Sequence, residues 1–167
     1  MKALAMGVGD KLIFDFELDF AGTLRCIPMI VRLKLDLCGI KLSLRQWSRF
    51  SRDEREALTY RPCGTAIEVP AYRAYLAWLI ETRAGETPID LPIDPSPDWA
   101  DAGRVPGRLV DHVRGLGLPA PTAAAWSRLT TLQRFTLIKL TRAGHDNDNF
   151  APALREFGLA VEAAPAD

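Results

Sequence analysis

The fold is decided by two similar stretches, WSRFSRDEREAL at residues 47–58 and WSRLTTLQRFTL at residues 126–137. Five of the twelve aligned positions are identical, and three more are close substitutions. The alignment continues upstream at a nearly constant offset through two further pairs of segments: Ile27-Pro28 with Val105-Pro106, and Gly39-Ile40 with Gly117-Leu118. Self-similarity at a fixed period indicates an internal repeat. We therefore predict that the chain is a diverged duplication.

The segment between the aligned proline and glycine decides between helix and hairpin. In the first copy, residues 31–37 alternate apolar and polar, and with residues 40–44 they could form a β-hairpin. In the second copy, the apolar residues fall on one helical face: Leu109, Val110, Val113 and Leu116. Because the two copies should share a fold, we predict a helix in each. The proline suits its first turn and the glycine a left-handed C-terminal cap.

Three further helices are predicted in each copy. A short helix carries the tryptophan and begins, in the first copy, at Ser43 with Gln46 three residues on. A longer helix begins at a capping box, Ser51-x-x-Glu54 or Thr130-x-x-Gln133. The fourth helix covers Pro70–Arg83 in the first copy and about Asn149–Phe157 in the second. The predicted class is therefore mainly α, with two repeats of about four short helices.

The N-terminal arm and the connector lie outside this helical pattern. Lys11–Phe20 alternates strictly and predicts a strand, which would pair with Ile89–Ile93 or with the same arm of a second copy, giving a homodimer. Gly85–Arg104 is rich in proline and acids, as in an extended connector. The predicted organisation, packed as one globular domain, is an arm at 1–24, repeat one at 25–84, the connector at 85–104, repeat two at 105–158 and a tail at 159–167.

Composition bounds the class of protein. The 167 residues are 48% hydrophobic, and 21 basic residues balance 21 acidic ones, which argues against a disordered chain or a polyelectrolyte nucleic-acid binder. No run is long and apolar enough for a membrane helix, and the start lacks a signal-peptide pattern, so we expect a cytoplasmic protein with no membrane partner. Three cysteines do not form a disulfide framework.

One block of sequence carries a family resemblance. It runs from Phe14 through Phe20 and continues in Leu24–Met29, Val31-Arg32, Lys34–Asp36, Cys38–Leu42 and Trp47. With these residues, the chain resembles the nitrate reductase associated protein family over most of its length. The resemblance implies a small accessory protein that supports production of active assimilatory nitrate reductase without itself reducing nitrate. It implies nitrate reductase as the partner, and neither catalytic residues nor a cofactor.

The residues offer no strong metal or catalytic site. Cys26 and Cys38 should lie about 18 Å apart along the first helix, too far to share a metal, although one could pair with Cys63. Buried thiols are the commoner role. Asp146-x-Asp148 resembles the start of an EF-hand loop, but the required glycine and glutamate are missing. His112 and His145 have no ligand spacing. We therefore expect no metal, no cofactor and no enzymatic activity.

The aromatic residues are expected to lie in the core. Trp47 and Trp126 occupy equivalent repeat positions, which usually fill equivalent core sites. Tyr72, Tyr75 and Trp78, with Leu76 and Leu79 between them, predict a packed stripe on one helix.

Charge is the better guide to a binding surface. Residues 25–61 contain nine basic residues against four acids, whereas residues 85–167 contain eight basic and eleven acidic residues. These basic side chains either pair internally or form a face that docks an acidic partner. On the second interpretation, the predicted partner-binding residues are Arg25, Arg32, Lys41 and Arg45.

Two other functional classes remain open from the sequence. Successive short helices and the basic first copy fit a helix-turn-helix DNA-binding regulator. Zero net charge and the lack of a distinctly basic recognition helix count against nucleic acid. An enzyme with an unrecognised site would need a paired acid and base or a ligand cluster, which the spacing does not provide.

Overall fold

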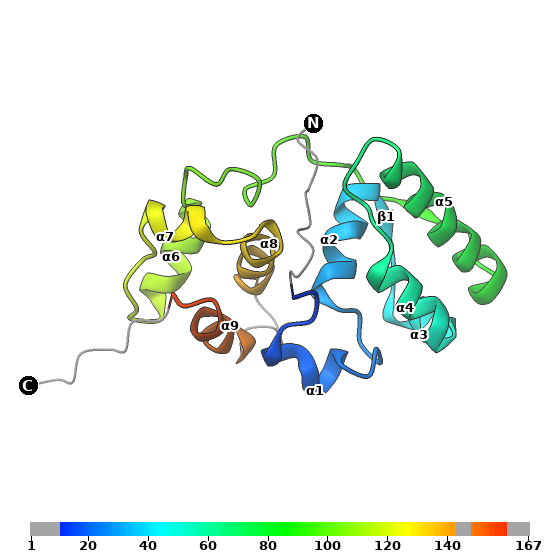
Figure 1. The fold of residues 1–167 in the computed structure, drawn as a ribbon, viewed down its shortest axis with the longest axis horizontal. Helices are drawn as coiled ribbons and strands as arrows, with labels where there is room; N and C mark the ends of the chain where they lie inside the picture. Colours follow the sequence, from blue (N-terminus) through cyan, green and yellow to red (C-terminus); the bar gives the residue numbers. More distant parts are fainter. Residues whose placement is uncertain (1–10, 143–147, 160–167) are drawn as a thin grey trace, which may run out of the picture. The chain divides into compact units, whose positions relative to one another are not determined.

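The computed structural model describes residues 11–142 and 148–159, and these residues are mainly helical (Figure 1). The chain divides into two compact units, Met1–Pro95 and Ser96–Asp167. The described elements of the first unit are η1 (Asp15–Glu17), α1 (Leu18–Ala21), α2 (Met29–Cys38), β1 (Ile40–Lys41), α3 (Leu44–Arg49), α4 (Arg52–Tyr60), α5 (Glu68–Leu79), η2 (Ile80–Ala84) and β2 (Ile89–Asp90). Those of the second are α6 (Gly107–Gly115), α7 (Ala123–Arg128), α8 (Thr131–Leu140) and α9 (Phe150–Glu156). None of these helices has the length and apolar character to span a membrane.

The predicted N-terminal strand is wrong, because residues 15–21 form the short helices η1 and α1. Phe14, Glu17 and Ala21 are buried, and their spacing of three and four residues is helical. Leu18, which the strand would have placed beside Phe14 on one face, is 49% exposed. The expected pairing of this arm, and the homodimer built on it, therefore lose their basis.

The connector contributes a strand that pairs with β1 and not with the N-terminal arm. β2 pairs with β1 in an antiparallel two-stranded sheet, with Ile40 opposite Asp90 and Lys41 opposite Ile89. The Leu91 N–H also donates to the Gly39 carbonyl at 2.8 Å. The first part of the connector thus belongs to the first unit rather than forming a free linker.

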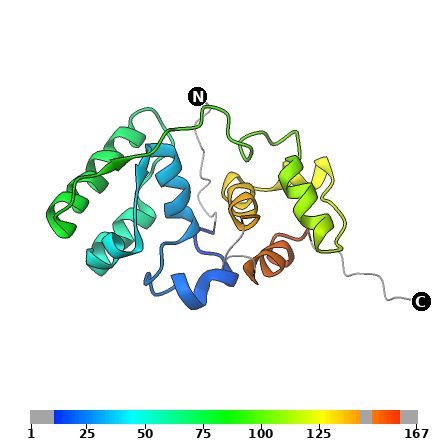
Figure 2. The ribbon, with the colours of Figure 1, turned by 180° about the vertical axis from the view of Figure 1, so that it is seen from behind.

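Helix α2 is the central helix of the first unit, and the hairpin alternative is rejected. It begins after Pro28 and buries seven of its ten residues. Figures 1 and 2 show it beside β1, and it also packs against α4 and α5. Gly39 ends the helix with φ 72°, and a Cβ there would lie 2.9 Å from Ile93 Cγ1. Both the left-handed backbone and the close approach of the connector therefore require glycine.

The capping boxes are confirmed at all three predicted positions. Ser43 caps α3, Ser51 caps α4, and Thr130 caps α8, each with a reciprocal bond from the residue three positions on. α5 begins at Glu68, two residues before the predicted start, because Thr65 and Glu68 form the same reciprocal pair of bonds. Each box satisfies two backbone N–H groups that would otherwise lack partners.

A tryptophan and an arginine fasten a loop to the helices in each unit. In the first unit, Trp47 Nε1 donates to the Leu24 carbonyl at 2.8 Å, and Arg55 donates to the carbonyls of Leu24, Trp47 and Ser48. Trp47 and its counterpart in the second unit, Trp126, are both fully buried, as predicted.

The aligned residues of the second unit make the same kind of contact. Trp126 Nε1 donates to the Asp101 carbonyl at 2.9 Å, and Arg134 donates to the carbonyls of Trp99 and Leu129. The burial of aligned helices differs, however, since α6 buries only Leu109 and Val113. The aligned tryptophan and arginine thus make similar contacts in both units, while the repeat structure stays a prediction.

Candidate partner-binding surface

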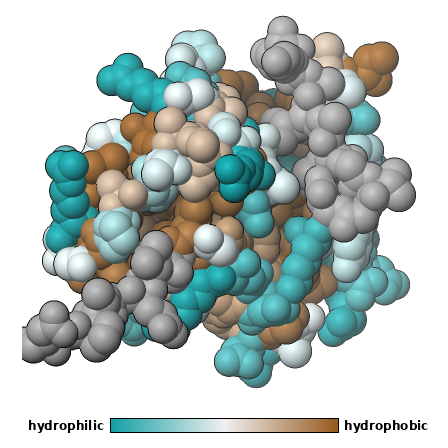
Figure 3. Space-filling view, turned by 60° about the vertical axis from the view of Figure 1, so that its left-hand side comes forward, coloured by the Kyte–Doolittle hydropathy of each residue, from teal (hydrophilic) through white to brown (hydrophobic). Residues whose placement is uncertain are grey.

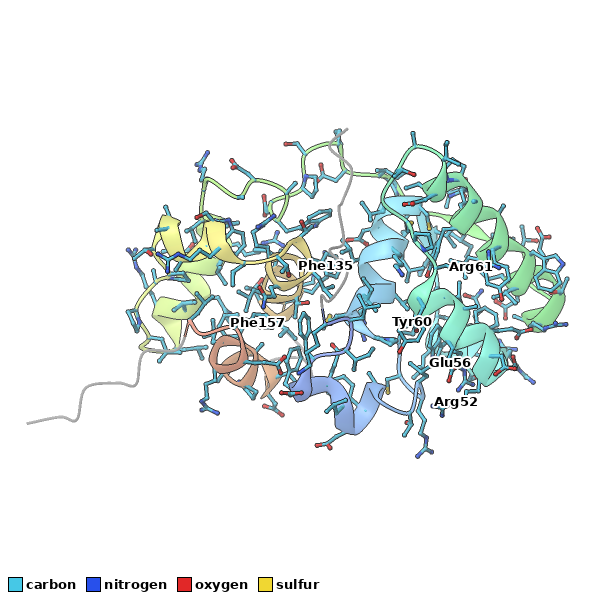
Figure 4. All side chains as sticks on the ribbon, viewed as in Figure 1. Arg52, Glu56, Tyr60, Arg61, Phe135 and Phe157 are labelled. Atoms are coloured by element: carbon cyan, nitrogen blue, oxygen red, sulfur yellow. The ribbon has the colours of Figure 1, made fainter. Side chains whose placement is uncertain are left out.

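The nine basic residues between positions 25 and 61 do not form one surface, because several are engaged within the fold. Lys34 is buried, and Arg55 is bound to three carbonyls. Arg52 pairs with Glu56, one turn along α4, as Figure 4 shows. Arg25, Lys41, Arg45, Arg49 and Arg61 are exposed. Summed charge along the sequence thus overstates the basic surface of the first unit.

Arg25 lies at the junction held by Arg55. The Arg55 guanidinium donates to the Leu24 and Ser48 carbonyls at 3.2 and 3.0 Å, so the residues that follow these carbonyls, Arg25 and Arg49, flank the same group. Arg32 is half-buried at the same end of α2, where its Nε donates to the Ile27 carbonyl at 3.3 Å. The two exposed arginines, Arg25 and Arg49, therefore lie close to the N-terminal end of α2.

Lys41 follows the C-terminal end of α2, and Arg45 begins the short helix α3 that leads back towards Leu24. Lys41 is exposed on β1, and Arg45 is exposed in the first turn of α3. Arg45 Nη1 lies 3.6 Å from Glu86 Oε1, and Gln46 Nε2 donates to the other oxygen of this carboxylate at 2.7 Å. Such an exposed ion pair contributes little stability and exchanges readily for another carboxylate.

The structure does not gather the four predicted binding residues on one element. Arg25 precedes α2 and Arg32 lies in it, whereas Lys41 is on β1 and Arg45 is in α3. Trp47, two residues after Arg45, donates to the Leu24 carbonyl, so α3 lies beside the segment that leads to Arg25. Lys41 follows the other end of α2, a helix of ten residues that is about 15 Å long. A partner that contacts all four must therefore reach from the start of α2 to its end.

The buried Lys34 caps the C-terminal end of α4 and does not face a partner. Its Nζ donates to the Thr59 and Arg61 carbonyls, both at 2.6 Å, which are among the last backbone acceptors of that helix. Burial lowers the pKa of Lys34 from 10.5 to about 8. The charge is placed at the negative end of the α4 dipole. Lys34 is thus a structural cation.

Two of the three cysteines behave as core thiols. Cys38 and Cys63 are buried, and burial raises the pKa of Cys38 and raises that of Cys63 to about 12. Such thiols are neutral and poorly nucleophilic at physiological pH. Cys26 is half-buried. In residues 11–142 and 148–159, no three His, Cys, Asp or Glu side chains gather as metal ligands. The EF-hand-like Asp146 and His145 lie outside these ranges, so metal-free protein stays a prediction.

The expected packed stripe on α5 is only partly buried. Tyr72, Leu76 and Leu79 are buried as expected, but Trp78 is 47% exposed. At 100° per residue, Trp78 lies about 120° around α5 from Tyr72, so a helical wheel would have separated it from the buried stripe. Figure 3 shows that apolar residues elsewhere also reach the surface among hydrophilic ones.

Comparison with protein families identifies a match over most of the chain. Residues 13–157 match the profile of a protein family described as conserved nitrate reductase-associated protein. No curated protein and no solved structure matches the chain.

Proposed function

The chain belongs to the family of conserved nitrate reductase-associated proteins, and we propose that it is a non-catalytic, cytoplasmic accessory protein for assimilatory nitrate reductase. It binds the enzyme directly and supports its maturation or activity. The observation that carries this proposal is the family match, which spans nearly all of the described residues. The exposed side chains of Arg25, Lys41 and Arg45 supply a means of docking.

Electrostatics gives the docking model its physical basis. Arg25, Lys41 and Arg45 are exposed and carry mobile charged ends. Exposed cations accelerate encounter with an acidic surface and make the association sensitive to salt. Glu86 beside Arg45 occupies one such cation in the free protein, and an acidic partner would replace this weak contact with its own carboxylate.

Deleting the gene should lower nitrate reductase activity while leaving the enzyme polypeptide present. An accessory factor acts after synthesis, so the amount of polypeptide is not expected to fall with activity. Enzyme assays and immunoblots of the same extracts, with the complemented strain as control, measure the two quantities. Loss of nitrate reductase transcript would instead favour a DNA-binding regulator and contradict the accessory role.

Reversing charge at the four predicted contacts should abolish binding of nitrate reductase. The variant combines Arg25→Glu, Arg32→Glu, Lys41→Glu and Arg45→Glu, which places like charges opposite an acidic partner. We expect the dissociation constant to rise by at least about 100-fold, since several like-charge contacts are created together. Binding is measured by surface plasmon resonance at two salt concentrations, and folding is checked by circular dichroism.

A matched variant controls for loss of positive charge alone. Arg128→Glu removes an exposed arginine at the end of α7, the position aligned with Arg49. It should bind with wild-type affinity. Unchanged binding by a folded fourfold variant would reject the contact assignment. A triple charge reversal at Arg25, Arg32 and Arg45 and the single variant Lys41→Glu then report whether the partner spans α2.

A further inference from the structure

Four planar side chains form a row that runs from the residue after α4, along α5, to η2. The Arg61 guanidinium carbon lies 3.9 Å from the centre of the Tyr75 ring. The Tyr75 and Trp78 rings stack with centres 6.1 Å apart and planes 22° apart. Arg83 lies over Trp78 at 5.2 Å. We name these residues, Arg61, Tyr75, Trp78 and Arg83, the aromatic–arginine row.

Arg61, Trp78 and Arg83 are exposed, and Tyr75 between them is half-buried. Trp78 is 47% exposed, and the neighbouring Tyr60 is 64% exposed. Figure 4 places Tyr60 and Arg61 at the end of α4. By contrast, Trp47 and Trp126 are fully buried and donate to backbone carbonyls. Exposed tyrosine, tryptophan and arginine are the residue types enriched where protein interfaces gain most of their energy.

The row presents hydrogen-bond donors that the described part of the chain does not use. The Arg61 guanidinium, the Tyr75 hydroxyl and the Trp78 indole N–H bond to no described residue. Arg83 donates to Glu54, so this end of the row is neutralised. The Arg61 end carries a positive charge with no described carboxylate beside it. Stacking on Tyr75 holds that guanidinium in a fixed plane, which reduces the entropy cost of binding.

We propose that the aromatic–arginine row is a docking surface for a carboxylate-rich segment of a partner protein. Carboxylates accept paired hydrogen bonds from a guanidinium fork, and they complement the charge at Arg61. The Tyr75 hydroxyl and the Trp78 indole N–H can donate to further acceptors. The row includes none of the residues Arg25, Arg32, Lys41 and Arg45, and the proposal does not depend on nitrate reductase being the partner.

The stacking geometry favours a protein segment over single-stranded nucleic acid. Nucleic-acid platforms need open aromatic faces on which bases can stack. Here Tyr75 has Arg61 against it and Trp78 beside it, while Trp78 has Tyr75 and Arg83 as its neighbours. The ring edges and the guanidinium donors are what remains for a ligand.

The test uses poly-L-glutamate as the probe and acrylamide quenching of Trp78 as the readout. The fluorescence of Trp78 is obtained as the difference between wild type and Trp78→Phe. In the wild-type full-length protein, poly-L-glutamate should shield Trp78 from acrylamide. Arg61→Gln should raise the apparent dissociation constant about tenfold, as expected for loss of a central interface arginine.

The matched control is Arg49→Gln, which removes another exposed arginine of the first unit. It should retain wild-type shielding, and circular dichroism should show that both variants are folded. The backbone carbonyl of Arg61 still accepts from Lys34 after either substitution. Equal quenching of Trp78 with and without poly-L-glutamate would overturn the proposal. Shielding by oligo(dT) but not by poly-L-glutamate would also overturn it, by assigning the row to nucleic acid.

Discussion

Arg134→Met should lower the free energy of unfolding by about 3 kcal/mol, which corresponds to a fall in Tm of roughly 10 °C for a chain of this length. The Arg134 side chain is buried and donates to the Trp99 carbonyl at 2.9 Å, to the Leu129 carbonyl and to Thr131 Oγ1. Methionine fills a similar volume but donates nothing. Two carbonyls would lose their donor, and each such group costs about 1–3 kcal/mol when it stays buried.

The damage should extend from Arg134 to the loop that packs on Phe135. Trp99 lies edge-on to the Phe135 ring, with centres 5.8 Å apart, and the Asp101 carbonyl accepts from Trp126. Urea unfolding followed by circular dichroism measures the loss. Arg128→Met, an exposed arginine on the preceding helix, is the control and should change stability by less than about 0.5 kcal/mol. A loss below 1 kcal/mol for Arg134→Met would show that water replaces the missing donors.

The sequence predicted the features that depend on neighbours along the chain. Ser51 with Glu54 and Thr130 with Gln133 are three residues apart, so the capping boxes follow from local chemistry alone. Gly39 is similar, because the left-handed end of α2 requires a residue without a Cβ. Comparing the two copies then removed the helix–hairpin ambiguity that either copy alone would have left.

The prediction of an N-terminal strand was wrong, because alternation over only ten residues is weak evidence for a strand. The same sequence contains Phe14, Glu17 and Ala21 at helical spacing. In an alternating strand Glu17 would lie on the face opposite Phe14, but both side chains are buried. A periodicity argument that assigns charged residues to the outside cannot find such a helix.

The candidate surface was harder to predict, because the role of a basic residue depends on contacts with residues that are distant in the sequence. Lys34 meets carbonyls 25 and 27 residues away, and Arg134 meets one 35 residues away. A charge count from composition treats both residues as part of the surface. The exposure of Trp78 in the aromatic–arginine row was also missed, although the helical wheel of α5 separates Trp78 from the buried residues.

The stability of the protein should depend on pH through the buried Lys34. Burial lowers the pKa of Lys34 from 10.5 to about 8 in the folded state. Between these two values the unfolded chain binds more protons than the folded one, so this group's contribution to stability rises with pH. The penalty for burying the charge is fully present below pH 8 and disappears near pH 10.5. Its size is about 3 kcal/mol, taking 1.36 kcal/mol for each unit of pKa.

Two buried thiols and a buried tyrosine act in the opposite direction. Burial raises the pKa of Cys63 to about 12, and it also raises the pKa of Cys38 and of Tyr72. Above pH 9 the unfolded chain loses these protons first, so their contribution to stability falls as pH rises. The wild-type protein should therefore gain stability between about pH 8 and 9 and lose it at higher pH.

Lys34→Met separates the two effects, because it removes the lysine titration and leaves the thiols and Tyr72 in place. The stability of wild type relative to this variant should increase by about 2–3 kcal/mol between pH 7 and 10. Urea unfolding at each pH measures this difference, and Lys41→Met controls for the loss of one exposed lysine from the same unit. Methionine also leaves the Thr59 and Arg61 carbonyls without their donor, but that cost does not vary with pH. A difference that stays constant across this range would therefore show that Lys34 keeps its proton equally well in the folded and unfolded chain.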